Sequence, residues 1–356
     1  GPYCNCETKW GLPVGWNFND IWVDIVVVVD TSEAMGEADL ADAGEMIESF
    51  LSDGESDFLI TYTNAAFYTR VGVIAMSDTA TTLYNLNMTK NDKMRGKATI
   101  KKGVAGIDFV KAFDAAQKML QEGVNSKPER ANARQVVYYM TDSKPYLFGK
   151  SEFDVIDQFK ASQGVVIVNN LLKDGETEVS DSRDLASDGY YFANGDYVTA
   201  GLQSFCKANC FCASDKTAYG GGGDVAIEAA GGCYRGSSKG LPFNKAKDSC
   251  VDGGGILAVI HDQPKEVFLQ QVMSGTKSDY FWIGYEKSKS DEWYWEDGST
   301  DPYTNWGVNE PSPAPIAKCA YVDTTKRTLP WGAGNCNTGF PYACQFAPCQ
   351  VGNRDC

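Results

Sequence analysis

Two polar segments that directly follow strand-like runs carry oxygen atoms suited to a metal ion. Residues 22–30 are almost entirely apolar and lead into Asp30-Thr31-Ser32, and residues 135–141 lead into Asp142. Mg²⁺ and Mn²⁺ need hard oxygen ligands in near-octahedral geometry, with waters completing the shell. The same side chains are also common caps of helices and turns. Asp30, Ser32 and Asp142 are therefore either a weak, water-rich metal site or a set of structural caps.

The elements that must position these residues alternate between strands and helices. Strand-like runs occur at 22–30, 69–76, 135–141 and 164–172, and helical periodicity occurs at 40–51, 107–120 and 152–161. Apolar strands that alternate with helices are typical of a doubly wound α/β parallel sheet. Ligands of such sheets bind beyond the carboxyl ends of the strands, where Asp30 and Asp142 are expected.

Residues 21–205 resemble the von Willebrand factor A domain. The Asp-x-Ser sequence that begins at Asp30 and the Thr-Asp sequence at 141–142 fall at the family's places in the fold. The resemblance implies a metal-ion adhesion site built from Asp-x-Ser-x-Ser, a threonine and an aspartate. Here Ala34 replaces the second serine and Ile107 lies at or near the threonine position. We therefore expect a degenerate site that binds Mg²⁺ or Mn²⁺ weakly at most.

The cysteines favour an oxidising compartment. There are twelve, and none lies between Cys6 and Cys206. The Cys-x-Cys spacings at 4–6 and 210–212 lack the matched pairs that a zinc site needs. Disulfides explain the pattern better, so we expect a secreted, extracellular protein. The sequon at Asn87 agrees with a secreted glycoprotein, and without a signal peptide we expect a mature chain.

The last third of the sequence carries aromatic, glycine and cysteine motifs in a specific order. They are Phe-Trp-Ile-Gly at 281–284, Trp-Glu-Asp-Gly at 295–298, Asn-Trp at 305–306, Glu-Pro at 310–311, and then Cys319, Trp331, Cys336 and Cys344. This order resembles the C-type lectin-like domain, and the match reaches back to Cys233. The resemblance implies an α+β domain that binds a ligand outside the cell.

The same resemblance implies a calcium-dependent sugar site, but most of its ligands are replaced. The family's Glu-Pro-Asn reads Glu310-Pro311-Ser312, its later acidic residue falls near Lys318, and its Trp-Asn-Asp reads Trp-Gly-Ala at 331–333. Because Ca²⁺ takes six to eight oxygens, one surviving carboxylate cannot hold the ion. We expect the calcium site to be lost. Glu310 is then a surface carboxylate before a cis proline, or it contacts a ligand.

Ligand contact is expected at the long loop around 297–317 and at nearby aromatic residues. The candidate ligand-binding residues are Trp293, Tyr294, Asn309 and Glu310. Three of the five tryptophans in this part of the chain match core positions of the family, so that packing explains those. Trp293 and Tyr294 are freer and could be exposed.

Disulfide pairing is implied by the same resemblance. It pairs Cys250 with Cys344 and Cys319 with Cys336, and it gives Cys233 an upstream partner, for which we choose Cys212. The remaining cysteines are Cys4, Cys6, Cys206, Cys210, Cys349 and Cys356. The two ends of a domain often lie close together, so the first two of these are expected to reach the pair at 206 and 210, and the last two to pair with each other.

The sequence divides into five expected segments. They are a disulfide-containing segment at 1–20, the von Willebrand A-like domain at 21–205, a cysteine- and glycine-rich junction at 206–227, the lectin-like domain at 228–346, and a disulfide-containing tail at 347–356. Their tandem order resembles secreted two-domain proteins of nematodes.

No catalytic arrangement is found in the sequence, so we expect a protein that is not an enzyme. His261 is the only histidine, no Gly-x-Ser-x-Gly elbow occurs, and the glycines at 220–223 lack the lysine of a P-loop. The net charge of −15 argues against nucleic acid and anionic membranes as partners. No run is long enough to span a membrane.

These observations together predict a secreted adhesion or recognition protein. Its partner would be a protein or glycoconjugate, bound without calcium-dependent sugar coordination. Two alternatives remain open: a calcium-dependent carbohydrate-binding lectin of innate immunity that uses a displaced site, and a structural component of the extracellular matrix.

Overall fold

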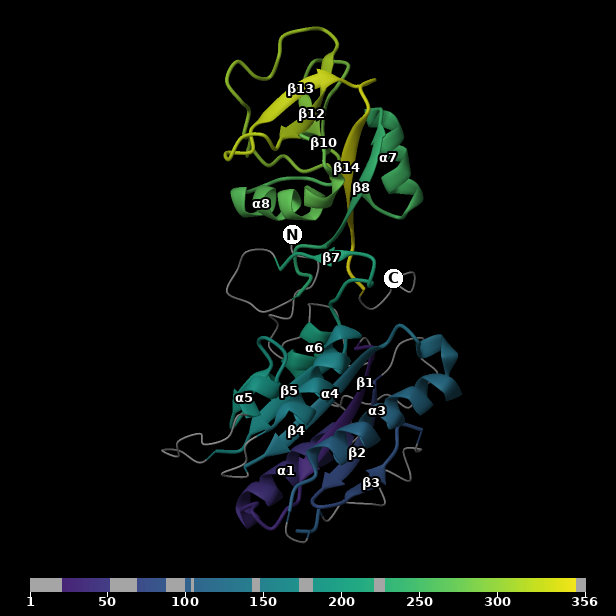
Figure 1. The fold of residues 1–356 in the computed structure, drawn as a ribbon, viewed down its shortest axis with the longest axis vertical. Helices are drawn as coiled ribbons and strands as arrows, with labels where there is room; N and C mark the ends of the chain where they lie inside the picture. Colours follow the sequence, from purple (N-terminus) through teal and green to yellow (C-terminus); the bar gives the residue numbers. More distant parts are fainter. Residues whose placement is uncertain are drawn as a thin grey trace. The chain divides into compact units, whose positions relative to one another are not determined.

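The computed structural model describes residues 21–51, 69–87, 100–103, 106–142, 148–172, 182–220 and 228–349. These residues fall into two compact units (Figure 1), and the chain passes from one to the other between Cys210 and Phe211. The expected junction at 206–227 is therefore shared between the two. Within the described ranges, no helix is long and apolar enough to cross a membrane.

The first unit is built on a six-stranded sheet. Its strands are β1 (Val23–Asp30), β2 (Arg70–Met76), β3 (Ala80–Tyr84), β4 (Arg134–Thr141), β5 (Val165–Asn170) and β6 (Tyr191–Ala193). They lie in the order β3-β2-β1-β4-β5-β6, and every neighbouring pair is parallel except β2 and β3. The predicted doubly wound sheet is confirmed. The antiparallel edge strand β3 was not anticipated.

Helices cover both faces of this sheet (Figure 1). They are α1 (Glu37–Leu51), α3 (Phe109–Ser126), α4 (Lys150–Ala161), α5 (Ser182–Leu185) and α6 (Gln203–Ala208). Successive residues of a strand point to opposite faces, and β4 shows this directly. The Tyr138 ring lies 5.4 Å from Phe50 of α1, whereas the Tyr139 ring lies 5.1 Å from Phe109 of α3. The central strands are therefore buried on both sides, as their continuous apolar runs predict.

The second unit is an α+β domain. Its strands are β7 (Thr217–Ala218), β8 (Cys233–Leu241), β9 (Ile256–Leu257), β10 (Tyr280–Lys287), β11 (Trp293–Trp295), β12 (Ala317–Asp323), β13 (Trp331–Asn335) and β14 (Phe340–Phe346). The main path of the sheet is β13-β12-β10-β14-β8-β7, with β11 paired to β10 and β9 to β14. Helices α7 (Phe243–Asp252) and α8 (Gln263–Met273) pack against it. The core between them contains Tyr234, Leu269, Ile283 and Trp331.

Three disulfides in the second unit match the expected pairings: two that the lectin resemblance implies, and the choice of Cys212 as the partner of Cys233. They are Cys212–Cys233, Cys250–Cys344 and Cys319–Cys336. The cysteines Cys206, Cys210 and Cys349 are also disulfide-bonded. The expected pairings of these three involve Cys4, Cys6 and Cys356, which lie outside the described residues.

Candidate functional site

The residues predicted to bind a metal do meet at one edge of the first sheet. Strands β1 and β4 are parallel neighbours, so Asp30 at the end of one lies beside Asp142 just after the other. The two carboxylate oxygens of Asp30 accept hydrogen bonds from the Ser32 amide at 2.9 Å and from the Thr141 hydroxyl at 2.7 Å. Asp30 and Ser32 are buried. The bond to the Ser32 amide is the kind of cap that the sequence also allowed.

A third carboxylate, from Asp39 in α1, joins this group. Asp142 Oδ2 accepts a hydrogen bond from the Gly36 amide at 2.9 Å. A Cβ atom at Gly36 would lie 3.0 Å from Asp39 Oδ2 and 3.1 Å from Asp142 Oδ2, so the two carboxyl groups converge on this glycine. Burial, together with a hydrogen bond that the protonated Asp142 donates to the Asp39 carboxylate, raises the pKa of Asp142 to about 7. Asp39 could not be predicted as part of this site, because acidic residues in a first helical turn are usually exposed.

These residues fit Mg²⁺ or Mn²⁺ only in part. Asp142 Oδ1 is buried without a hydrogen-bond partner, so it is available to a cation. Ala34 is exposed and offers no oxygen, and the Ile107 side chain packs against the hydrophobic core. Among the residues that the structure describes, no group of three or more His, Cys, Asp or Glu side chains is arranged to hold a metal.

We expect the first unit to bind Mn²⁺ with a dissociation constant of roughly a millimolar or weaker, because so few oxygens are available. Restoring one ligand with Ala34→Ser should tighten binding about fivefold, since a hydrogen-bond-sized contact contributes about 1 kcal/mol. Isothermal titration of both variants at pH 8 would measure this. Micromolar affinity of the wild-type chain would show that the site is better furnished than we infer.

In the second unit, the connection between β11 and β12 is the predicted long loop. The Glu310–Pro311 peptide bond is cis, as the family resemblance implies, and Asn309 has a positive φ of 63°. The Glu310 carboxylate is hydrogen-bonded within its own domain. Its Oε2 accepts hydrogen bonds from the backbone amides of Ser312 at 2.6 Å and Ala333 at 3.0 Å. Glu310 therefore fastens the loop to β13.

The space beside Gly332, one of the replaced calcium-ligand positions, is taken by an aromatic ring. A Cβ atom at Gly332 would lie 2.4 Å from the Tyr321 phenol, which is far closer than real contacts allow. Tyr321 is held in place by the rings of Tyr280 at 5.2 Å and Phe340 at 5.3 Å. The asparagine that the sugar-binding motif needs at position 332 would clash with this cluster. At position 332, aromatic packing therefore occupies the place of a ligand side chain.

The two candidate aromatic residues differ in exposure. Trp293 is half-buried rather than exposed, because its ring packs 4.8 Å from Trp306 and 5.3 Å from Tyr285. Tyr294 is exposed, and its hydroxyl donates a hydrogen bond to the Glu286 carboxylate. Trp293 thus belongs to the edge of the core, whereas Tyr294 and Asn309 remain accessible.

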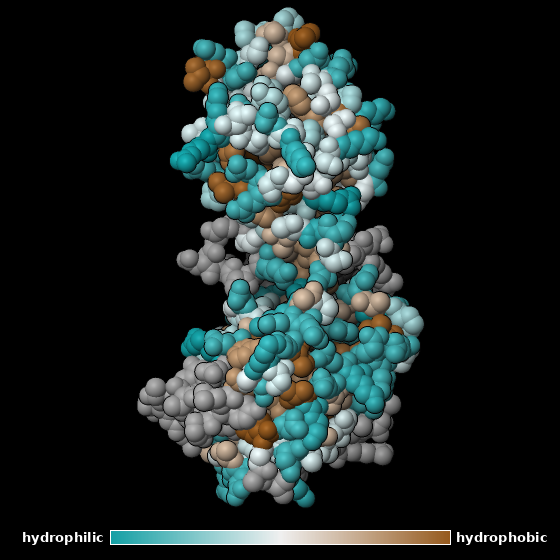
Figure 2. Space-filling view, in the orientation of Figure 1, coloured by the Kyte–Doolittle hydropathy of each residue, from teal (hydrophilic) through white to brown (hydrophobic). Residues whose placement is uncertain are grey.

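Two aliphatic side chains on the long loop are exposed, and sequence reasoning missed them. Val308 is 91% exposed and Ile316 is 62% exposed, and they flank the cis peptide. Figure 2 shows separate hydrophobic patches on a mainly hydrophilic or neutral surface at the end of this unit where Figure 1 draws the loop. Isolated exposed aliphatic residues are common, but two on one tethered loop form a candidate contact surface.

His261 is not part of a hydrolytic triad. Its Nε2 lies 2.9 Å from Asp297 Oδ2 and 3.1 Å from the Ser299 hydroxyl, so both partners contact the same nitrogen. A serine hydrolase needs the serine and the carboxylate on opposite ring nitrogens. The histidine instead holds the start of the long loop against the residues before α8.

The long loop is also anchored by a buried carboxylate that sequence reasoning missed. Glu266 of α8 accepts hydrogen bonds from Trp331 Nε1 at 2.7 Å and from Asn305 Nδ2 at 3.0 Å. Burial raises the pKa of Glu266 to about 7, although both hydrogen bonds act in the opposite direction. The amphipathic pattern of α8 could not show this, because the partners lie 39 and 65 residues away.

The second unit should therefore lose stability as the pH rises from about 4.5 to 7. In this window the folded Glu266 keeps a proton that the unfolded chain has released, so deprotonation of the folded state is unfavourable. We expect a loss of about 2 kcal/mol, which Glu266→Gln should largely remove. Urea unfolding followed by tryptophan fluorescence would test this, since five of the eight tryptophans lie in this unit. An equal pH dependence in both variants would contradict it.

Comparison with known proteins gives two family matches. A model of the von Willebrand factor type A domain matches residues 24–204, and one of the lectin C-type domain matches residues 239–346. The C-type lectin lectoxin-Lio3 of Erythrolamprus poecilogyrus is 30% identical over 118 residues, which are 32% of this chain and 73% of that protein. Ladderlectin of Oncorhynchus mykiss is 31% identical over 99 residues, which are 27% of this chain.

This chain spans about half, 52%, of the length of ladderlectin. Among solved structures, human lithostathine is 24% identical and covers 38% of this chain and 98% of its own, with a TM-score of 0.33. The C-type lectin CEL-I from Cucumaria echinata is 20% identical and covers 37% of this chain and 95% of its own, with a TM-score of 0.33.

Proposed function

The chain belongs to the von Willebrand factor type A family, and in its sequence this domain is followed by a C-type lectin domain. We propose that it is a secreted adhesion or recognition protein. Both domain types support an extracellular role in recognition. In the proposed mode, the lectin-like domain binds a protein partner through its long loop, without calcium. No chemical step is required of the chain.

The observation that carries this proposal is the use of Glu310. The one surviving ligand of the sugar site bonds to two backbone amides of its own domain, those of Ser312 and Ala333. Both bonds fall on Oε2, so this carboxylate offers an ion at most its Oε1, and no second carboxylate replaces the missing ligands in the Trp-Gly-Ala segment. The bonds hold the loop in one shape, which lowers the entropy that binding would otherwise lose.

The chemistry of the loop favours a protein ligand with an apolar patch. Val308 and Ile316 present aliphatic side chains, and the loop between them carries Pro311, Pro313 and Pro315 at exposed positions. Prolines restrict the backbone and present no amide donor for sugar hydroxyls. Burying two aliphatic side chains on a partner would contribute about 1.5–3 kcal/mol each.

The experiment compares binding in calcium with binding in EDTA. The full chain is immobilised and exposed to a glycan array and to extracellular fluid of the source tissue. Protein capture should persist in EDTA and should fall at least tenfold in the double variant Val308→Ser/Ile316→Ser. Val251→Ser is the matched control, because Val251 is 55% exposed but lies on α7.

Glycan binding that needs calcium would instead favour a calcium-dependent lectin. Self-association of the chain in sedimentation, with no captured partner, would favour a structural component of the extracellular matrix. Either result would contradict the proposed function.

A further inference from the structure

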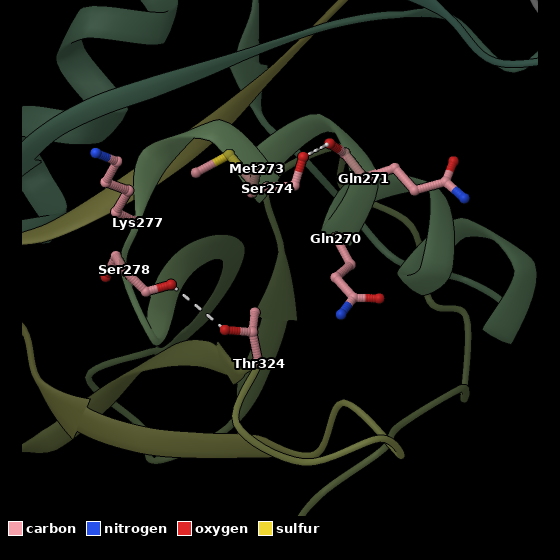
Figure 3. A pocket seen from close by; sticks show the side chains of 7 residues that line it. All are labelled: Gln270, Gln271, Met273, Ser274, Lys277, Ser278 and Thr324. Carbon is pink, nitrogen blue, oxygen red and sulfur yellow. Dashed lines mark hydrogen bonds between the residues drawn. The ribbon is translucent and has the colours of Figure 1, made fainter.

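The second unit contains a pocket of about 290 Å³ whose lining residues all lie outside the long loop. Figure 3 shows it beside the carboxyl end of α8. Its walls come from the last turn of α8, from the short helix η4 (Ser274–Thr276) with the residues after it, and from Thr324, which follows β12. Two parts of the chain that are distant in the sequence therefore build one polar hollow.

The hydroxyl groups of this pocket already use their protons. Ser274 Oγ donates to the Gln271 carbonyl at 2.8 Å, Ser278 Oγ donates to the Tyr280 carbonyl at 2.8 Å, and Thr324 Oγ1 donates to the Asp279 carbonyl at 3.0 Å. A hydroxyl has one proton and two lone pairs. Toward a ligand, these oxygens are therefore acceptors.

The side-chain amide of Gln270 is the group that can both donate and accept. It extends from α8 toward the level of Thr324, whereas Gln271 and Lys277 point outward (Figure 3). The buried Met273 lines the pocket as well and adds apolar atoms to its wall. A ligand would therefore meet one amide, several hydroxyl acceptors and one apolar surface.

The charges around the pocket favour a neutral ligand. An anion such as a carboxylate or phosphate only accepts hydrogen bonds, so it would face the lone pairs of Ser274 and Thr324 without compensation. A cation would need a carboxylate, but among the described residues that line the pocket the charged side chain is that of Lys277, which repels it. The ligand must therefore donate hydrogen bonds without carrying a charge.

An amide is the neutral group that matches Gln270 best. Two amides pair head to tail, because each donates an N–H to the oxygen of the other. A primary carboxamide, or the lactam edge of a heterocyclic base, can form this pair and still carry a further N–H for the hydroxyl acceptors. The volume lies at the lower end of the range for small-molecule sites, which suits a single flat ring against the apolar wall.

We propose that this pocket binds a small neutral ring compound through an amide, either a ring-bound primary carboxamide or a heterocyclic lactam. In this site Gln270 pairs with the ligand amide and determines the specificity. The inference does not depend on the proposed protein ligand, because the pocket and the long loop have no lining residue in common.

Saturation-transfer NMR on the full chain tests the proposal. Nicotinamide represents the carboxamide and uracil the lactam, so that the one that binds identifies the source of the amide. At least one of them should bind, with a dissociation constant on the order of a millimolar. Its fully N-methylated analogue should bind at least about fivefold more weakly to the same wild-type chain, because the donors are gone. Nicotinate is the anionic comparison and should also bind more weakly.

Gln270→Leu should weaken binding of the amide probe at least about fivefold, because it removes the pairing group. Gln263→Leu is the matched control, since Gln263 is exposed at the first residue of the same helix, and it should leave binding unchanged. The double variant Val308→Ser/Ile316→Ser should also bind normally. The proposal would be overturned if neither nicotinamide nor uracil bound, if the methylated analogue or nicotinate bound as well, or if Gln270→Leu retained full affinity.

Discussion

Replacing Asp24 by alanine is expected to lower the free energy of unfolding of the first unit by about 3–5 kcal/mol. Asp24 is fully buried in β1, where its oxygens accept from Arg70 at 2.6 and 2.8 Å and from Arg130 at 2.7 and 3.1 Å. Both arginines are also buried. Removing the carboxylate breaks these four charge-assisted hydrogen bonds to guanidinium groups that lie in the interior, where such a loss is strongly destabilising.

Urea unfolding followed by circular dichroism would measure the loss. The matched control is Asp154→Ala, which removes an exposed ion pair with Lys150 and should change stability by less than about 1 kcal/mol. Tryptophan fluorescence of the second unit gives an internal reference that should not move. Equal effects of the two substitutions would contradict the prediction, because the buried Asp24 would then contribute no more to stability than the exposed Asp154.

Removing the Cys250–Cys344 disulfide should have a comparable effect on the second unit. This bridge closes a segment of 94 residues, and the loop-entropy model gives it about 5 kcal/mol. Cys319–Cys336 closes only 17 residues and should contribute about 3 kcal/mol. The double variants Cys250→Ala/Cys344→Ala and Cys319→Ala/Cys336→Ala would be compared by urea unfolding. A larger loss from the shorter loop would indicate that native-state packing, and not chain entropy, dominates.

The hydrophobic pattern of neighbouring residues predicted the central strands and helices α1, α3 and α4 of the first unit. The uninterrupted apolar run of β1 indicated a strand buried on both faces, and its end at Asp30 placed the acidic edge correctly. The alternation of strands with helices gave the doubly wound sheet. The edge strand β3 carries the exposed polar residues Thr81 and Thr82, so it lacked the apolar signal by which the other strands were found.

The details of the sites depended on contacts between distant residues. Asp39 reaches Asp142 across the sheet edge, and Tyr321 fills the space beside Gly332. Neither contact has a local pattern, because each pair is brought together only by the folded sheet. The replaced calcium ligands were visible in the sequence, but the reason that position 332 does not accommodate an asparagine lies in the aromatic packing around Tyr321.

In the proposed function, the lectin-like domain recognises its partner with no calcium ion bound at Glu310. Titration of CaCl₂ into the full chain by calorimetry tests this most directly. Even weak extracellular calcium sites have dissociation constants of about 10⁻⁴–10⁻³ M. We expect the wild-type chain to show no calcium binding of that strength that depends on Glu310. A calcium affinity tighter than that, lost in Glu310→Ala and unchanged in the first-unit variant Asp142→Asn, would contradict the claim.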